Sequence, residues 1–172
     1  DLYNIMTFGF RWEAMASISS ISNMEIISRT KSDDFCSSLK IIWWEKQKIT
    51  NLWWEIWTKI IVENLFYNTP ARLNYLKKPR TEYSHILNYL QEISLSYPSI
   101  GFEFISDWKQ VFKYRQDEDI KTRIYNIYWE DFSNNLLEID FNMLWINIKW
   151  FISDPKVSFS NKNRQNIYIN SR

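Results

Sequence analysis

The spacing of apolar and polar residues along the chain predicts short helices alternating with strands. Apolar residues spaced four, three and four apart from Ile86 to Tyr97 follow one helical face, and Pro98 ends that helix. Between Met24 and Thr30 the residues are β-branched and alternate in polarity, which is typical of a strand. By the same patterns, helices are predicted at about 12–21, 71–77, 86–97 and 118–128, strands at about 24–30, 59–66, 136–141, 144–152 and 166–170, and a hairpin at 102–115.

The order of these elements is that of a mixed α+β protein. Residues 40–58 are polar and rich in Trp, and we expect them to form a hairpin-like excursion between two strands. Residues 116–119, Gln-Asp-Glu-Asp, interrupt the apolar pattern, which then restarts. We interpret this break as a domain boundary, with one domain over residues 1–115 and the start of a second over residues 116–172.

Composition narrows the class of protein. With 172 residues, of which 45% are hydrophobic and 24% charged, the chain can bury a core in one ordinary domain or parts of two. Its net charge of +1 does not by itself indicate nucleic-acid binding, and no apolar run approaches the roughly 18 residues of a membrane span. The lone Cys36 excludes an internal disulfide and a cysteine-rich zinc site. Because the chain starts at Asp1 without a Met or a signal peptide, we expect a piece of a longer cytoplasmic protein with no membrane partner.

Several tryptophans occupy positions at which the predicted backbone conformation favours glycine. An average protein of this length holds about 12 Gly, whereas this chain has 2 Gly and 10 Trp. Asp107-Trp108 separates two alternating runs, where Asp-Gly would make a two-residue hairpin turn with positive φ at both positions. Two Trp-Trp pairs, at 43–44 and 53–54, lie in loop-like stretches in which Gly-Gly would be ordinary.

We interpret these positions as glycine codons written as tryptophan. UGA encodes Trp in one common variant code and Gly in a few bacterial lineages, and the richness in Ile, Asn and Lys suits an AT-rich genome. Trp129 follows a helical pattern at the place where a glycine commonly ends a helix, as this interpretation requires. The alternative is a non-enzymatic interaction module whose Trp residues are genuine and form an aromatic binding surface.

Three segments become readable once Trp is taken as Gly. Residues 7–18 read TFGFRGEAMASI, residues 57–72 read GTKIIVENLFYNTPAR, and residues 164–172 are RQNIYINSR. Together they closely resemble the MutL family of DNA mismatch repair ATPases, members of the GHKL group that also contains DNA gyrase and the histidine kinases. The resemblance runs in order along the whole chain. It implies the C-terminal part of a GHKL (Bergerat) α/β sandwich ATPase domain over 1–115, followed by the start of a transducer domain similar to ribosomal S5 domain 2.

The first segment has the form of a phosphate-binding turn. A Gly-rich turn that leads into a helix presents several backbone N–H groups to an anion, and Cβ atoms would block the close approach of phosphate. The resemblance implies that this segment is the ATP lid. The residues expected to face the phosphates are Gly9, Phe10, Arg11 and Trp12, the last of them read as Gly.

The other two segments supply further candidates. The resemblance implies that Thr58 lies on a central strand at the floor of the nucleotide pocket, near the adenine. The sequence alone leaves open that Thr58 is a buried strand residue satisfied by backbone. Asn68 and Arg72 are expected to cap and brace the following helix. Arg172 is implied to face DNA, although Ser171 stands where the family usually has Gly.

The resemblance implies an ATP-dependent repair protein that links mismatch-bound MutS to downstream nuclease or helicase steps. ATP would act mainly as a conformational ligand. The partners would be MutS, DNA bound largely without sequence specificity, and a second copy joined through the N-terminal region when ATP binds. The family's catalytic Glu and its Mg²⁺-binding Asn precede the region present here. We therefore assign no catalytic residue and no metal ligand to this chain, and we expect it not to hydrolyse ATP alone.

Another GHKL enzyme, such as a type II topoisomerase subunit, is the second alternative. The strings GFR(G)EA and LFYNTPAR favour MutL over it. The sequence leaves open whether a C-terminal endonuclease domain exists and which nuclease or helicase acts downstream.

Overall fold

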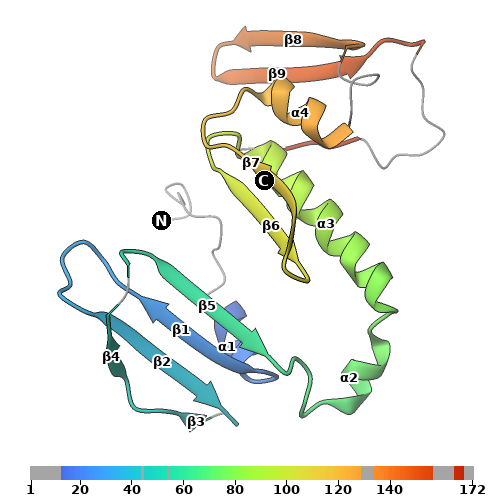
Figure 1. Ribbon diagram of the computed structural model, residues 1–172. Helices are drawn as coiled ribbons and strands as arrows, with labels where there is room; N and C mark the ends of the chain where they lie inside the picture. The colour runs from blue at the N-terminus through green and yellow to red at the C-terminus, as the bar shows by residue number, and fades with distance from the viewer. Residues whose placement is uncertain (1–12, 44, 54, 129–133, 157–164, 169–172) are drawn as a thin grey trace. The chain divides into compact units, whose positions relative to one another are not determined.

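The computed structural model describes residues 13–43, 45–53, 55–128, 134–156 and 165–168 (Figure 1). The chain divides into two compact units, residues 1–78 and 79–172, and each is described by itself. Both units combine helices with antiparallel strands, which confirms the predicted α+β class.

The first unit is built on an antiparallel sheet. Its helices are α1 (Glu13–Ser19) and α2 (Pro70–Tyr75), and its strands are β1 (Asn23–Ser28), β2 (Cys36–Ile42), β3 (Glu45–Lys46), β4 (Thr50–Leu52) and β5 (Thr58–Glu63). The strand order is β3-β2-β1-β5, and β4 pairs with the first part of β2. The buried apolar residues of this unit are Met24, Ile27, Cys36 and Ile41. Its core therefore lies on β1 and β2.

Strand β2 was not predicted from the sequence. Its residues alternate between the two faces of the sheet, but Ser37, Ser38 and Lys40 give it a polar composition. Ser38 is buried because its hydroxyl donates a 2.8 Å hydrogen bond to the Glu25 carboxylate of β1. The Lys40 ammonium lies 3.6 Å from the same carboxylate. Cross-strand partners thus stabilise a strand that reads locally as a loop, and the expected excursion over 40–58 contains the end of β2 together with β3 and β4.

The second unit surrounds one cluster of buried side chains. Its elements are α3 (Pro79–Ser96), β6 (Phe102–Ser106), β7 (Lys109–Tyr114), α4 (Ile120–Tyr128), β8 (Leu136–Met143) and β9 (Ile146–Ser153). The buried cluster consists of Leu95, Tyr114, Ile124 and Ile127. Phe102, Leu136 and Phe151 pack against it from the strands. The core therefore joins α3 and the β6–β7 hairpin to α4 and the β8–β9 hairpin.

Most other predicted elements occur with somewhat different ends. Helix α3 begins at Pro79, whereas the apolar spacing marks it only from Ile86, because Arg80, Thr81 and Glu82 in its first turn are polar. Residues 165–168 have no regular secondary structure, and the rest of the strand predicted at 166–170 lies outside the described residues.

The domain boundary predicted between residues 115 and 116 lies within the second unit. There, α4 shares a core with α3 and β7. The two compact units are defined by contacts between residues in the structure. The predicted boundary instead marks where the resemblance changes from the ATPase domain to the transducer domain. The division into 1–115 and 116–172 therefore stays a prediction.

Two described Trp residues have the backbone conformation of glycine. Asp107 (φ 48°) and Trp108 (φ 64°) form the two-residue turn between β6 and β7, with the positive φ values predicted for an Asp-Gly turn. Trp43 (φ 54°) begins the two-residue connection from β2 to β3. Bulky L-residues rarely adopt positive φ, and Trp108 is 100% exposed, so packing does not offset the strain. Trp12, Trp44, Trp54 and Trp129 lie outside the described residues.

Candidate functional site

Among the predicted nucleotide-binding and DNA-binding residues, the structure describes Thr58. The residues that lie outside the described part of the chain are Gly9, Phe10, Arg11, Trp12 and Arg172. Helix α1 begins at Glu13, the residue that follows the predicted lid residues in the sequence. The candidate site is therefore built from Thr58 and from the elements that flank the predicted lid.

Thr58 is the first residue of β5, and its side chain is exposed. It lies opposite Ser28 at the end of β1, and the two hydroxyl oxygens are 2.8 Å apart. Just beyond this pair, the Arg29 N–H donates to the Trp57 carbonyl at 3.1 Å and extends the strand pairing. Thr58 is thus not a buried residue satisfied by backbone. Its hydroxyl has a hydroxyl partner and remains accessible.

The face of β5 that carries Thr58 is apolar. Ile60 and Val62 follow Thr58 at alternate positions, so the three side chains lie on one side of the sheet. Ile60 is 50% exposed and Val62 is 42% exposed. Ile26 of β1 lies opposite Ile60 and continues the apolar surface, whereas Met24, opposite Val62, is buried. An apolar face with an accessible hydroxyl at one end is chemistry suited to the flat base of a nucleotide.

The second motif, residues 57–72, is hydrogen-bonded to the segment that follows the first motif in the chain. The Phe66 N–H donates to the Ile21 carbonyl at 2.7 Å. The Asn68 side-chain amide donates to the Ser20 carbonyl at 2.8 Å. The turn after β5 thus holds the connection between α1 and β1, which follows the predicted lid.

This geometry corrects the role expected for Asn68 as a helix cap. The N-cap of α2 is Thr69, which makes no side-chain cap hydrogen bond, and Pro70 opens the helix. Arg72 is exposed in the last turn of α2. Four buried side-chain oxygens in this region have no partner within the described part of the chain: Asn23 Oδ1, Tyr67 Oη, Asn68 Oδ1 and Thr69 Oγ1.

The single His and the single Cys of the chain do not add to the site. His85 is exposed on α3, and the fully buried Cys36 thiol donates to the Glu55 carbonyl at 3.7 Å. The described residues contain no group of three or more His, Cys, Asp or Glu that could hold a metal ion. Within the described ranges, no helix is both long enough and apolar enough to cross a membrane.

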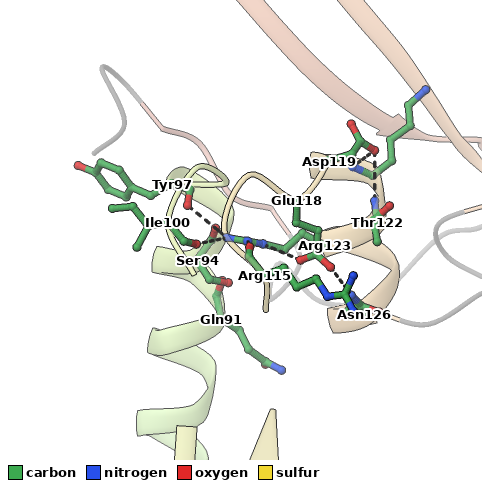
Figure 2. Close-up of polar contacts among 11 residues, drawn as sticks. Gln91, Ser94, Tyr97, Ile100, Arg115, Glu118, Asp119, Thr122, Arg123 and Asn126 are labelled. Carbon is green, nitrogen blue, oxygen red and sulfur yellow. Dashed lines mark hydrogen bonds and ion pairs between the residues drawn. The ribbon is translucent and has the colours of Figure 1, made fainter. Parts of the chain in front are cut away.

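Arg123 is a buried polar residue that the sequence patterns did not single out. Its exposure is 0%, and its guanidinium forms an ion pair with Glu118 at 3.1 Å (Figure 2). The signal that could have revealed it is its position on α4, between Ile120 and Ile124 on the apolar helical face. A charged residue on an apolar face indicates a buried, paired charge.

No family model matches the chain. The DNA mismatch repair protein MutL of Halothermothrix orenii is 35% identical to it over 172 residues, which is 100% of this chain and 27% of that protein. MutL of Streptococcus uberis is 37% identical over 174 residues, covering 100% of this chain and 26% of that protein. The chain thus spans about a quarter of the length of the curated relatives it matches.

Solved structures have the same fold. The Aquifex aeolicus MutL ATPase domain complexed with ADP matches with a TM-score of 0.73 at 23% identity, covering 88% of this chain and 64% of that one. The N-terminal domain of a DNA repair protein matches with a TM-score of 0.78 at 23% identity, covering 100% of this chain and 56% of that one. Homologues named MutL therefore cover the whole chain, and its fold matches that of MutL ATPase domains.

Proposed function

We propose that this chain is a segment of a MutL-type DNA mismatch repair ATPase, with the end of the GHKL domain over 1–115 and the start of the transducer domain over 116–172. Homology over the whole chain and the fold of the MutL ATPase domain support this proposal. The structural observation that carries it is the hydrogen bond from Asn68 of the second motif to the Ser20 carbonyl, in the turn between α1 and β1 that follows the first motif. The relatives and solved structures described above are MutL and DNA repair proteins, so the second GHKL candidate, a topoisomerase subunit, is not favoured.

The nucleotide site uses both motifs. The lid residues, which face the phosphates, are Gly9, Phe10, Arg11 and Trp12 read as Gly. Thr58 lies near the adenine, because its accessible hydroxyl beside Ile60 and Val62 matches a flat base with a polar edge. The relative complexed with ADP supports a nucleotide on this fold. Mg²⁺ would neutralise phosphate charge, and its ligands are residues of the longer protein upstream of this chain.

In the longer protein, ATP acts as a conformational ligand that favours the state in which lid and floor close together. That state dimerises through the N-terminal region, and it relays mismatch recognition by MutS to the downstream enzymes on DNA. We place this activity in the cytoplasm. The 172 residues by themselves do not hydrolyse ATP, since the family's catalytic Glu is not among the motifs found here.

We further propose that the Trp positions are glycines in the natural protein. The positive φ values at Trp43 and Trp108 support this, because Gly adopts them without strain. The coding DNA and the intact mass of the natural protein test the proposal. UGA codons and a mass lower by one indole-methyl group per position are expected, whereas UGG codons would show that the tryptophans are genuine.

Substitution of Thr58 tests the nucleotide site. In the full-length protein with Gly restored, Thr58→Val should weaken binding of a non-hydrolysable ATP analogue about threefold to tenfold, the effect of one lost hydrogen bond. Thr50→Val is the matched control, since Thr50 is also an exposed first residue of a strand. Equal analogue affinities for both variants and the parent, measured by calorimetry, would remove Thr58 from the site.

The proposed DNA contact is tested by Arg172→Glu in the same protein. Binding to all DNA sequences should weaken about equally, because a phosphate contact carries no base information. The slope of log K against log salt should fall by roughly 0.9 for the lost phosphate contact. Binding of the ATP analogue should not change. An unchanged salt slope with unchanged DNA affinity would show that Arg172 does not contact DNA.

A further inference from the structure

The Arg123 side chain forms a buried junction in the second unit (Figure 2). All three of its nitrogens donate, to one carboxylate and four backbone carbonyls. The acceptors are Glu118 Oε2 at 3.1 Å, the carbonyls of Ser94 at 3.0 Å, Tyr97 at 3.2 Å and Ile100 at 3.0 Å, and the carbonyl of Arg115 at 2.6 Å. The other Glu118 oxygen accepts from the Asn126 side chain at 2.9 Å. The buried charge is therefore neutralised, and each of its three nitrogens has at least one acceptor.

This arrangement requires a guanidinium. The planar fork of Arg reaches acceptors in several directions at once, whereas a Lys ammonium is a point donor on a flexible stem. The Arg123 guanidinium also lies 6.0 Å from the centre of the Phe102 ring and 5.5 Å from that of Tyr114. Aromatic rings favour a cation at this distance. Arg123 thus binds the last turn of α3, the turn that follows it and the end of β7.

The backbone is closely packed at the same place. A Cβ atom on Gly101 would lie 3.2 Å from the Gln116 nitrogen and 3.3 Å from the Tyr114 carbonyl oxygen. The turn after α3 and the segment after β7 are therefore in direct contact. Arg123 and this backbone contact together fix the position of residues 114–116, so this segment is not a flexible linker.

A second attachment leads to the same helix. The Tyr168 hydroxyl donates to the Glu92 carbonyl of α3 at 2.7 Å. The Asn166 amide donates to the Tyr128 hydroxyl at the end of α4 at 2.9 Å. Residues 165–168 precede the proposed DNA contact Arg172 in the sequence. The segment that leads to this contact is thus anchored on α3 and α4.

Resting on the proposed function, we propose that Arg123 and Tyr168 are positioning residues that couple the DNA-contacting segment to the ATPase domain through the C-terminal half of α3. Their backbone acceptors, from Glu92 to Arg115, precede the predicted domain boundary, and both donors follow it. Neither residue touches nucleotide or DNA. When α3 shifts, α4 and residues 165–168 shift with it, because the hydrogen bonds of Arg123 and Tyr168 attach them to α3.

The test uses the full-length protein with Gly restored and the variant Tyr168→Phe, which removes one hydroxyl. ATP hydrolysis is measured with and without DNA, and the dissociation constants for an ATP analogue and for DNA are measured separately. We expect the rate without DNA and both dissociation constants to stay within about twofold of the parent. In the parent, we expect DNA to raise the rate of hydrolysis, because the proposed coupling joins the DNA contact to the ATPase domain, and a rate that DNA leaves unchanged would overturn the coupling. In Tyr168→Phe, the factor of this stimulation should fall about twofold to tenfold.

Tyr89→Phe is the matched control, because Tyr89 is an exposed tyrosine on α3. It should leave the stimulation by DNA unchanged. Full stimulation in Tyr168→Phe, or a loss of DNA affinity as large as the loss of stimulation, would overturn the coupling role. Arg123→Lys should lower the stimulation by DNA more than Tyr168→Phe does. If Arg123→Lys does not fold, the result for Tyr168→Phe alone decides whether the coupling role holds. If the unsubstituted protein neither binds nor hydrolyses ATP, the proposed function fails instead.

Discussion

Arg123 and Thr58 are both polar residues on regular elements, but their surroundings differ. Arg123 is completely buried, and acceptors within the second unit satisfy it. Thr58 lies on an exposed apolar face and has one hydroxyl partner. A group whose partners all lie within the fold contributes to stability, whereas a group on an open apolar face is available to a ligand. The two residues should therefore respond in opposite ways when stability and binding are measured separately.

Arg123→Met should give the largest effect, on stability. Removing one partner of a buried ion pair leaves Glu118 and several carbonyls unpaired, which typically costs about 3 to 5 kcal/mol. The free energy of unfolding is measured by denaturant titration of the Gly-restored protein. Lys113→Met is the control, since the exposed pair of Lys113 with Glu103 should contribute about 0 to 1 kcal/mol. Similar losses in both variants would contradict the structural role of Arg123.

Gly101→Ala should give the next largest effect. The new Cβ would lie against backbone atoms of residues 114–116, which can move only together with the Arg123 junction. We expect a loss of about 1 to 3 kcal/mol in unfolding free energy, as for other overpacked sites. The exposed Lys48→Ala should change it by less than about 0.5 kcal/mol. An unchanged free energy of unfolding in Gly101→Ala would mean that the backbone around Arg123 can move to accommodate the new Cβ atom.

Retaining Trp108 in an otherwise Gly-restored protein should have a smaller effect. A left-handed conformation costs a non-glycine residue about 1 to 2 kcal/mol, and Trp108 has a φ of 64°. Trp145, which is 87% exposed in the turn between β8 and β9, is the matched control. Its φ is not in the left-handed region, so retaining it should cost less. Thermal unfolding of the two proteins checks the order, and equal stabilities would contradict the strain assigned to Trp108.

The smallest effect concerns pH. Burial, with smaller contributions from the nearby Tyr128 and Glu92, raises the pKa of the Tyr168 hydroxyl to about 12. Because the unfolded value is about 10, the folded state favours the protonated hydroxyl. Its contribution to stability is present below about pH 10 and is lost between about pH 10 and 12. The difference in absorbance titration between the parent and Tyr168→Phe measures this ionisation, and a midpoint near 10 would contradict the burial of the Tyr168 hydroxyl.

Local patterns in the sequence were sufficient for much of the fold. The apolar period predicted α3, the alternation predicted β1, and Asp107-Trp108 predicted a hairpin turn with positive φ at both positions. These features depend on neighbouring residues, so a single segment contains the information for them. The residue strings of the two motifs likewise indicated the MutL family. The nucleotide and DNA roles of their residues stay predictions.

Contacts between distant segments required the tertiary structure. Strand β2 is polar in composition, and only Glu25 on the neighbouring strand accounts for the burial of Ser38. Asn68 was expected to cap a helix, yet it binds the Ser20 carbonyl far away in the sequence. The sequence showed a charge on the apolar face of α4, but not the carbonyls that surround Arg123. The amino-acid sequence thus determined most local elements and the resemblance to MutL, whereas the fold decided which buried polar groups meet, because hydrogen-bond partners from distant segments leave no periodic trace in the chain.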